Sequence, residues 1–483
     1  MLQGQRLRPY FDLNMIGAVI AGTAAILLFA RALCHFDDSW DGTHYHLVFA
    51  AFRAHILTFN DLEPIPNVTA WYHSYPPLLD FVRGYLWRIT GSILILQTLN
   101  LAAIAALAAF WKSRFGLSIR WTLIAILSVP LIQISATTLY VDTFTNCFFS
   151  IAISVLSAAF IDRRPLNRSE VVISLTALAV SANVKPQFVI LGTIALAILC
   201  FYQFLCLARQ GNRGDLRFFL GLTAIACVAV PAMALHNLLE FRNPIYPLAI
   251  SIFGHSLPSL FPPSAAWQGP DYLSHVPQPV RWLASLLEYR AFEGRDIPYT
   301  IDQHDLIPVG FMPALDLPRP ASFRMGGYFV PLALGLLTWL MIFTRCYMPR
   351  DRIRWFIPLF LASLIAFLPG SHELRYYSFW ILNLIFLCFL AERRAQEDSV
   401  AFRASLIVTF ISVGMVTGWR YFDPSPYSVQ DHIHNYGIDH AITGRDICFE
   451  NRNRDPILFT WIFHTAGRYR VIDLAPGEHC PPT

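Results

Sequence analysis

Charged residues are scarce in this sequence: they make up 14% of it, against about 25% in an ordinary soluble domain. Hydrophobic residues fill 55% of its 483 positions. This composition excludes an ordinary soluble globular protein and favours one that lies mostly in a membrane. Lysine is nearly missing, since Lys112 and Lys185 are the only two, and arginine carries the other positive charges. We expect no nucleic-acid partner.

Cysteine gives no sign of a metal centre, because the nine cysteines show no CxxC or other metal-ligand spacing. Cys448 and Cys480 lie in a polar C-terminal tail and are candidates for a disulfide if that tail faces an oxidising compartment. A cleavable signal peptide is not expected. The first apolar run, 14–34, is too long for one and lacks a small-residue cleavage site, so we expect it to be a membrane span.

Apolar runs long enough to cross a bilayer recur along the chain, since a helical span needs about 20 apolar residues. We predict about eleven spans, two of them short. The predicted spans are 14–34, 92–111, 121–138, 143–161, 170–184, 187–207, 218–236, 328–344, 355–369, 377–391 and 402–418.

Two long connections, 35–91 and 237–327, and the tail 419–483 separate or follow these spans. We expect residues 1–418 to form one all-α polytopic membrane domain, with interfacial helices in the first connection. Within the tail, 457–460 and 468–472 have the character of strands, so a small α/β appendage is expected there.

The distribution of arginine and lysine predicts the orientation of the spans. With a cytoplasmic N-terminus, 18 basic residues fall on the cytoplasmic side, and the three short loops opposite hold only Lys185 and Arg375. Both long connections and the tail are then extracytoplasmic, and the protein belongs in the plasma (inner) membrane.

The acidic residues and histidines lie mainly on the opposite side. Only eight of the 32 acidic residues fall on the cytoplasmic side, and all fifteen histidines lie on or at the outer side. The spans themselves hold few ionisable groups, whereas transporters more often place such groups at mid-membrane. The pattern therefore predicts that polar chemistry takes place at the outer rim of the membrane.

Three carboxylates follow the first span within five residues: Asp37, Asp38 and Asp41. Mutual repulsion and lost hydration near the hydrocarbon edge suit such acids to general base work or cation binding. A solvated acidic loop that merely ends the helix is the structural alternative. We favour function, because 45–58 is amphipathic and is expected to lie flat on the membrane, which would hold the acids at headgroup depth.

Two further rim features lie before the second and the fourth spans. The run Tyr75-Pro76-Pro77-Leu78 opens a second amphipathic stretch to Ile89, which is expected to close the site as an interfacial helix. Asp142 lies in a very tight connection. It is either the N-cap of the next helix or a ligand, and these two roles are compatible.

Two short outer turns carry the remaining candidates. Lys185 joins two spans almost without a loop, where it either snorkels to the interface or binds phosphate as a point charge. His372, Glu373 and Arg375 lie together in a compact charged turn. A Glu373–Arg375 ion pair is the structural alternative there. The functional one is a phosphate clamp by Arg375, with His372 or Glu373 tuning a metal or a proton.

Taken together, these motifs resemble the GT-C superfamily of polytopic glycosyltransferases, which includes protein O-mannosyltransferases and the lipid A aminoarabinose transferase. Asp41, Tyr45 and His46 resemble the acidic motif of the family's first outer loop. The run from Tyr75 to Leu78 resembles its second interfacial helix. This order along the chain carries the resemblance as much as the residue types do.

Later motifs agree with that order. Asp142 lies where the family keeps a second acid, and Lys185 matches a basic residue between two later spans. The run from Asn243 to Pro247 is similar to a motif that follows the seventh span in many bacterial members. The resemblance covers about residues 10–395, and the tail matches no family that we can name.

The resemblance implies an inverting glycosyltransferase that takes its sugar from a polyprenyl-phosphate donor in the membrane lipid. The acceptor would be an extracytoplasmic glycan, lipid or protein. Asp41 is assigned as the base, with Asp38 as its rival, because an acceptor hydroxyl must lose its proton. Lys185 and Arg375 are assigned to the leaving phosphate.

Five residues complete the predicted substrate-binding site: His46, Tyr75, Asp142, His372 and Glu373. Asp142 is expected to orient the acceptor or to hold a divalent cation, and His46 to assist. Mg²⁺ or Mn²⁺ is the cofactor under consideration, with Asp142 and His372 as candidate ligands.

Two other classes stay open. A polymerase or ligase of surface polysaccharide would use polyprenyl-diphosphate glycans and large outer loops rich in arginine, of which 237–327 has six. A lipid or sugar transporter is the alternative that is not an enzyme, and it would predict ionisable residues or broken helices at mid-bilayer.

Overall fold

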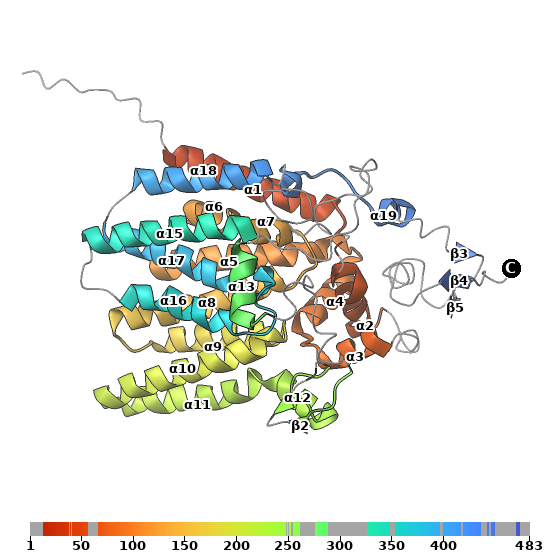
Figure 1. The fold of residues 1–483 in the computed structure, drawn as a ribbon, viewed down its shortest axis with the longest axis horizontal. Coiled ribbons are helices and arrows are strands. Elements are labelled where there is room, and N and C mark those ends of the chain that lie inside the picture. Colours follow the sequence, from red (N-terminus) through yellow and green to blue (C-terminus); the bar gives the residue numbers. More distant parts are fainter. Residues whose placement is uncertain are drawn as a thin grey trace, which may run out of the picture.

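The computed structural model describes this chain as a bundle of helices (Figure 1). The described residues are 13–37, 39, 41–56, 66–247, 249, 251–252, 255–260, 276–287, 326–347, 353–396, 399–416, 419–435, 442–443, 446–449 and 470–473. Asp38 therefore lies outside them, as does most of the second long connection.

Most helices run side by side along one direction, and α2, α3 and α4 lie together at one end of the bundle (Figure 1). The helices are α1 (Leu13–Cys34), α2 (Leu47–Arg53), α3 (Pro66–Ser74), α4 (Leu78–Thr90), α5 (Thr98–Phe115), α6 (Ile119–Leu127), α7 (Pro130–Ser135), α8 (Asp142–Asp162), α9 (Arg168–Ala182), α10 (Gln187–Gln210), α11 (Arg213–Ala229), α12 (Ala232–Phe241), α13 (Gln278–Leu287), α15 (Gly326–Tyr347), α16 (Ile353–Ala366), α17 (Phe379–Arg394), α18 (Val400–Val416) and α19 (Val429–Asn435).

Every predicted span coincides with a helix or a broken pair of helices. Among the described residues, four helices are long and apolar enough to cross a membrane: α1, α8, α10 and the helical stretch Leu94–Phe115 that contains α5. The bent pair α11–α12 makes a fifth if it is one span. Three shorter apolar helices follow at Val330–Arg345, Trp355–Ala366 and Val400–Met415. The protein is thus mostly helical with several apolar helices, and the count of eleven spans stays a prediction.

Two predicted spans are broken at a proline. The span 121–138 divides into α6 and α7, and Pro130 is the first residue of α7. The span 218–236 bends by 43° between α11 and α12, next to Pro231. Proline lacks the N–H that would continue a helix and clashes with the preceding turn. The break after α7 matters most, because it delivers the non-helical segment 136–141 to the end of the bundle that carries α2–α4.

This segment is buried, so its backbone polar groups need partners inside the protein. Asn100 in α5 supplies several of them. Its amide nitrogen lies 2.8 Å from the carbonyl oxygen of Ser135, 3.0 Å from that of Thr138 and 2.8 Å from that of Tyr140. One buried amide therefore holds an irregular segment at the end of two apolar helices.

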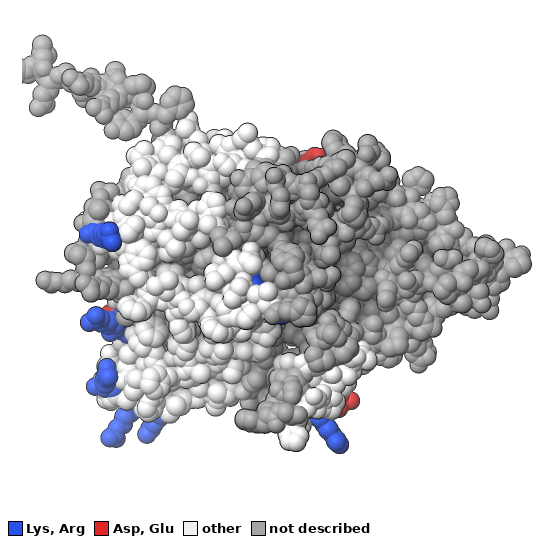
Figure 2. Space-filling model, in the orientation of Figure 1, with Lys and Arg blue, Asp and Glu red and all other residues white. Residues whose placement is uncertain are grey.

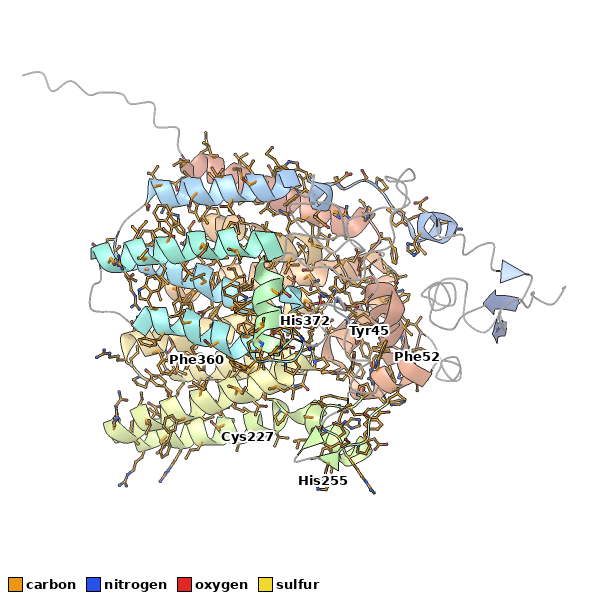
Figure 3. All side chains as sticks on the ribbon, in the orientation of Figure 1. Tyr45, Phe52, Cys227, His255, Phe360 and His372 are labelled. Carbon is orange, nitrogen blue, oxygen red and sulfur yellow. The ribbon has the colours of Figure 1, made fainter. Side chains whose placement is uncertain are left out.

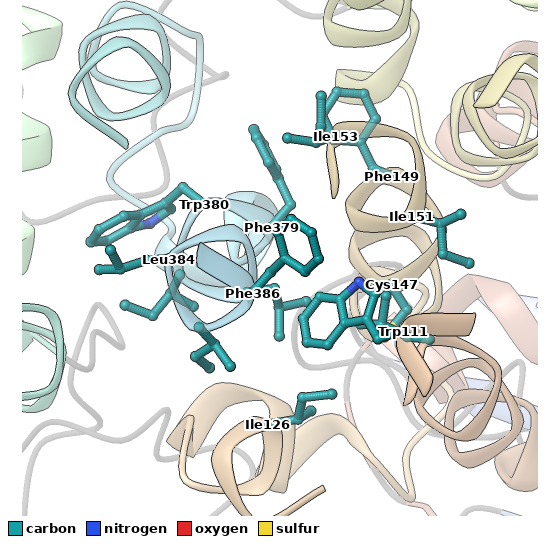
Figure 4. Packing of buried hydrophobic residues seen from close by; sticks show 14 of the residues in the cluster. Trp111, Ile126, Cys147, Phe149, Ile151, Ile153, Phe379, Trp380, Leu384 and Phe386 are labelled. Atoms are coloured by element: carbon teal, nitrogen blue, oxygen red, sulfur yellow. The ribbon is translucent and has the colours of Figure 1, made fainter. Parts of the chain in front are cut away.

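Helix α8 lies at the centre of the bundle, and 83% of its most apolar stretch is buried. Aromatic contacts join neighbouring helices around it: the rings of Phe149 and Phe379 lie 4.6 Å apart, and those of Trp111 and Phe386 lie 5.4 Å apart (Figure 4). Near its N-terminal end, Asn146 accepts a hydrogen bond from the backbone N–H of Phe379 at 2.8 Å and donates one to the carbonyl of Arg375 at 3.1 Å. This helix therefore fixes the turn that carries Arg375.

The first long connection differs from its prediction. Within 45–56, the described part of the stretch 45–58, the α-helix covers only α2. Residues 47–52 are all buried, so α2 packs inside the protein and does not lie flat on the membrane as expected. Helix α4 is the amphipathic one: it buries Leu79 and exposes apolar side chains such as Val82 and Ile89. The prediction of an amphipathic helix after Tyr75 therefore agrees with the structure.

Helices α2 and α4 cross closely at Gly84. A Cβ atom at this position would lie 2.1 Å from the carbonyl oxygen of Ala50. We expect Gly84→Ala to destabilise the protein by about 1–3 kcal/mol, because the backbones must separate. Gly221→Ala in α11 is the matched control, since nothing lies within 4 Å of the added methyl. Thermal midpoints in detergent measure both, and equal midpoints would show that the crossing tolerates a side chain.

Two small sheets complete the described structure. Strands β1 (Ser251–Ile252) and β2 (His255–Ser256) pair antiparallel. In the tail, β4 (Asp446–Phe449) pairs antiparallel with β3 (Ile442–Thr443) and parallel with β5 (Arg470–Asp473). Strand β5 overlaps the predicted strand 468–472, whereas 457–460 and Cys480 lie outside the described residues.

The start of the tail packs beside the end of α1, where Phe36 donates a backbone hydrogen bond to the carbonyl of Tyr427 at 2.8 Å. The tail therefore leaves the bundle at the end that carries α2–α4 (Figure 1). Lysine and arginine side chains gather along the opposite end in the visible face of the molecule (Figure 2).

Candidate active site

Four segments from distant parts of the sequence meet at the end of the bundle beneath α2–α4. They are the first loop 37–46, the buried segment 136–141 with the start of α8, the turn at Lys185 between α9 and α10, and the turn 371–377. Figure 3 places Tyr45 and His372 at this end of the bundle. The predicted rim residues thus come from loops that the helices bring together.

Asp41 and Arg375 form an ion pair, with 3.2 Å between Asp41 Oδ2 and Arg375 Nη2. Asp41 directly precedes a π-helical turn, Gly42–His46. The guanidinium of Arg375 lies over the ring of Tyr140, 4.3 Å from its centroid, and near that of Tyr376 at 5.3 Å. Its Nε and Nη1 atoms are buried and have no hydrogen-bond partner among the described residues. Arg375 therefore keeps donors for a further anion while it contacts Asp41.

Asp142 and Lys185 form a second ion pair, and both residues are buried. The Lys185 ammonium also lies 3.7 Å from the centroid of the Tyr376 ring. Burial lowers the pKa of Lys185, and the charge of Asp142 opposes that shift. Lys185 is thus held inside the protein and does not snorkel to solvent.

Asp142 is not the N-cap of α8. Val141 occupies that position, and Asp142 is the first helical residue, with its side chain turned to Lys185. Its Oδ2 atom is buried without a hydrogen-bond partner among the described residues. A buried carboxylate oxygen of this kind is expected to find a partner in a bound molecule or water.

The two ion pairs share Tyr376, because the cations of both lie over or near its ring. Tyr45 and Tyr75 extend the aromatic surface, with ring centroids 6.0 Å apart. Burial and the nearby charge of Asp41 raise the pKa of both phenols, so Asp41 lies close to them. Aromatic rings beside two cations and two carboxylates are a combination of groups suited to contact a sugar with an attached anion.

Asp37 has a structural role. Its carboxylate accepts hydrogen bonds from the backbone N–H of Leu139 and from the backbone and hydroxyl of Ser39. The bond from Leu139 fastens the first loop to the segment 136–141, and the bonds from Ser39 hold the loop itself. Of the two described acids after the first span, Asp37 and Asp41, it is Asp41 that pairs with a cation of the site, Arg375. The third acid, Asp38, lies outside the described residues.

A third polar cluster was not predicted from the sequence. His46 Nδ1 lies 3.1 Å from Asp80 Oδ1, and Arg83 Nη1 lies 3.8 Å from the same oxygen. Arg83 is fully buried and donates to the carbonyl of Tyr140 at 3.4 Å. Asp80 and Arg83 are three residues apart on the buried face of α4, a pattern that a search for charges on an apolar helix face could have found.

We expect Asp80→Asn to destabilise the protein by about 3 kcal/mol or more, because it removes the charge next to the buried guanidinium of Arg83. Asp215→Asn is the control, since it breaks the exposed Arg168–Asp215 pair, which is worth about 0–1 kcal/mol. Thermal midpoints distinguish the two cases. Equal small losses would mean that Asp80 does not compensate the charge of Arg83.

His372 and Glu373 lie at the edge of the site, with 3.9 Å between His372 Nε2 and Glu373 Oε1. Neighbouring Ser371 accepts a hydrogen bond from Gln278 of α13 at 2.8 Å. Within the described part of the chain, no group of three or more His, Cys, Asp or Glu is arranged to hold a metal ion. Asp142 and His372, the candidate metal ligands, therefore belong to no such metal-binding group among the described residues.

Comparison with known proteins adds little to this geometry. No protein-family model matches the sequence, and no curated protein matches it. The crystal structure of ArnT from Cupriavidus metallidurans in the apo state is similar to this chain, with a TM-score of 0.39 and 14% identity over 95% of this chain and 85% of that chain. A likeness at this level does not establish a shared fold, so the functional proposal depends on the site itself.

Proposed function

We propose that this protein is an integral membrane glycosyltransferase of the GT-C type, which moves a sugar from a polyprenyl-phosphate donor to an extracytoplasmic hydroxyl. The observation that carries the proposal is the meeting of two carboxylate–cation pairs, Asp41–Arg375 and Asp142–Lys185, at one end of the helix bundle. The resemblance of the rim motifs to GT-C enzymes supports the same reaction.

The cations fit the leaving group. Lys185 and the unpartnered N–H groups of Arg375 offer charge-assisted hydrogen bonds to a phosphate, and arginine can bind it through two donors. A nearly dry site strengthens this attraction relative to water. A lipid-borne phosphate has a short path to them, because the site lies at the ends of apolar helices.

The carboxylates fit the nucleophile. Asp41 takes the proton of the acceptor hydroxyl, and the acceptor oxygen forms a bond to C1 of the sugar. The bond from C1 to the phosphate oxygen breaks, and its electron pair leaves with the polyprenyl phosphate. Asp142 Oδ2, which has no hydrogen-bond partner among the described residues, would accept a hydrogen bond from a bound hydroxyl.

Asp41 is engaged with Arg375 in this structure, so the acceptor hydroxyl competes with the guanidinium for the carboxylate. Phosphate from the donor competes with Asp41 for this guanidinium. Donor binding would thus occupy Arg375 and release Asp41 in a single step, before the acceptor reacts.

The test is to incubate the purified protein with a panel of polyprenyl-phosphate monosaccharides and polyprenyl-diphosphate glycans, and to detect the released lipid by mass spectrometry. Release of polyprenyl phosphate from a monophosphate donor is the expected result. Turnover of diphosphate donors alone would instead identify a polymerase or ligase. The expected location is the plasma membrane, with the N-terminus in the cytoplasm and the site outside.

A further inference from the structure

A polar cavity lies at the opposite end of the bundle, remote from the candidate active site. It has a volume of about 640 Å³ and opens where α5, α8 and α17 end and α9 begins. Four arginines line it: Arg114, Arg164, Arg393 and Arg394. Figure 2 shows basic side chains along this end of the molecule.

Three of these arginines are held by two acids. Glu170 pairs with Arg114, and with Arg164 at 2.7 Å. Asp162 pairs with Arg394, and with Arg164 at 3.5 Å. These bonds fix the guanidinium groups around the cavity in a defined arrangement.

Arg393 differs from the other three, since it forms no ion pair with any described residue. Its guanidinium lies against the turn that ends α5, where a Cβ at Gly116 would be 2.9 Å from the Arg393 Cζ atom. The cavity thus holds four cations against two neighbouring acids, which leaves a surplus of two positive charges and one exposed arginine beside the space.

Arginines near helix C-termini often do no more than interact with the last carbonyl groups and the helix dipole. Arg114, Arg393 and Arg394 all lie in last turns, so this role applies to each of them. It requires neither a cavity nor an arginine that lacks an ion pair among the described residues, as Arg393 does. The remaining lining includes Phe115, Ala158 and Leu390, which form an apolar side next to the guanidinium groups.

We propose that this cavity binds the phosphate of an anionic phospholipid from the adjoining membrane leaflet, with Arg393 as its main contact. Arginine clusters between membrane helices on the cytoplasmic side suit anionic headgroups, and the charge distribution of the chain assigns this end to the cytoplasm. The apolar side of the cavity would accommodate the start of an acyl chain, which a free phosphate lacks. This site does not depend on the proposed transferase reaction.

The test uses the full-length protein in detergent and titrates phosphatidylglycerol, phosphatidylcholine or inorganic phosphate. Thermal shift and native mass spectrometry measure the binding of each. Arg393→Gln is expected to weaken phosphatidylglycerol binding about tenfold, the usual scale of a lost charge-assisted hydrogen bond. Arg209→Gln is the matched control, because Arg209 is an exposed arginine in the last turn of α10 and does not line the cavity.

The proposal is supported if the protein binds phosphatidylglycerol selectively, and if Arg393→Gln weakens this binding while Arg209→Gln leaves it unchanged. Equal binding of inorganic phosphate with the same loss in Arg393→Gln would assign the cavity to a free phosphate anion and overturn the lipid source. Equal binding of phosphatidylcholine, or equal effects of the two variants, would overturn the site itself. The thermal midpoint without lipid shows that each variant is folded.

Discussion

Asp41→Asn is expected to reduce sugar transfer at least about 100-fold while the protein still folds and inserts into the membrane. The amide cannot take the proton of the acceptor hydroxyl. The same change removes the partner of Arg375, so a donor phosphate no longer competes with Asp41 for that guanidinium. We therefore expect donor binding at least as tight as in the wild type. Initial rates and donor affinity, measured on one preparation, give both values.

This separation of rate from binding distinguishes a base from a structural residue. Asp423→Asn is the control, since Asp423 is an exposed acid at the same end of the bundle whose side chain accepts hydrogen bonds from the backbone and hydroxyl of Ser425. Near-wild-type transfer by Asp41→Asn would contradict the assignment. Weaker donor binding with an unchanged rate would make Asp41 a binding residue and leave the base to be found elsewhere, with Asp38 as the first candidate.

Lys185→Met is expected to have two effects. It removes a cation for the donor phosphate, and it leaves Asp142 as a buried charge without its partner. The second effect costs about 3–5 kcal/mol of stability, as for other buried pairs that lose one member. Donor affinity should fall about tenfold or more, because a charge-assisted bond to phosphate is lost. Thermal midpoints and donor titrations measure these effects separately.

The double variant Lys185→Met with Asp142→Asn separates the two roles of Lys185. Removing both charges restores most of the stability, since no buried charge is left without a partner. Donor affinity should stay low, because the phosphate cation is still missing. Recovery of donor affinity in the double variant would mean that Lys185 serves only to balance Asp142.

The helical framework was predictable because a bilayer forces long apolar runs, and these are visible without tertiary structure. The rim residues were predictable for a related reason: charges that cannot remain in the hydrocarbon gather at helix ends. Asp41, Asp142, Lys185 and Arg375 were all chosen on this ground, and the structure brings them together around Tyr376; their role in a substrate site stays a prediction.

The pairing of those residues was not predictable, because it depends on contacts between distant segments. The sequence offered Glu373 as the partner of Arg375, whereas the ion pair of the structure is with Asp41. The supporting amides Asn100 and Asn146 look like ordinary polar residues in apolar helices. Their roles appear only when the segments that they join are side by side.

The local breaks were missed for a different reason. A hydropathy pattern measures how apolar a run is, and α6 and α7 together satisfy it although Pro130 separates them. Helix α2 was misjudged because its partial periodicity suggested one lipid-facing side, while α3 and α4 cover it with protein. Tertiary packing overrides periodicity in such short helices.

The central claim is that the protein transfers a sugar from a polyprenyl-phosphate donor to an acceptor hydroxyl. The most direct test uses reconstituted vesicles that contain the donor identified by the panel and an acceptor that cannot cross the membrane. The measurement is the molar ratio of polyprenyl phosphate to glycosylated acceptor, determined by mass spectrometry for the wild type and for Asp41→Asn. We predict equal amounts of the two products from the wild type, and at least about 100-fold less of each from the variant. Labelled sugar that crosses the membrane without a covalent product would contradict the account and identify a transporter.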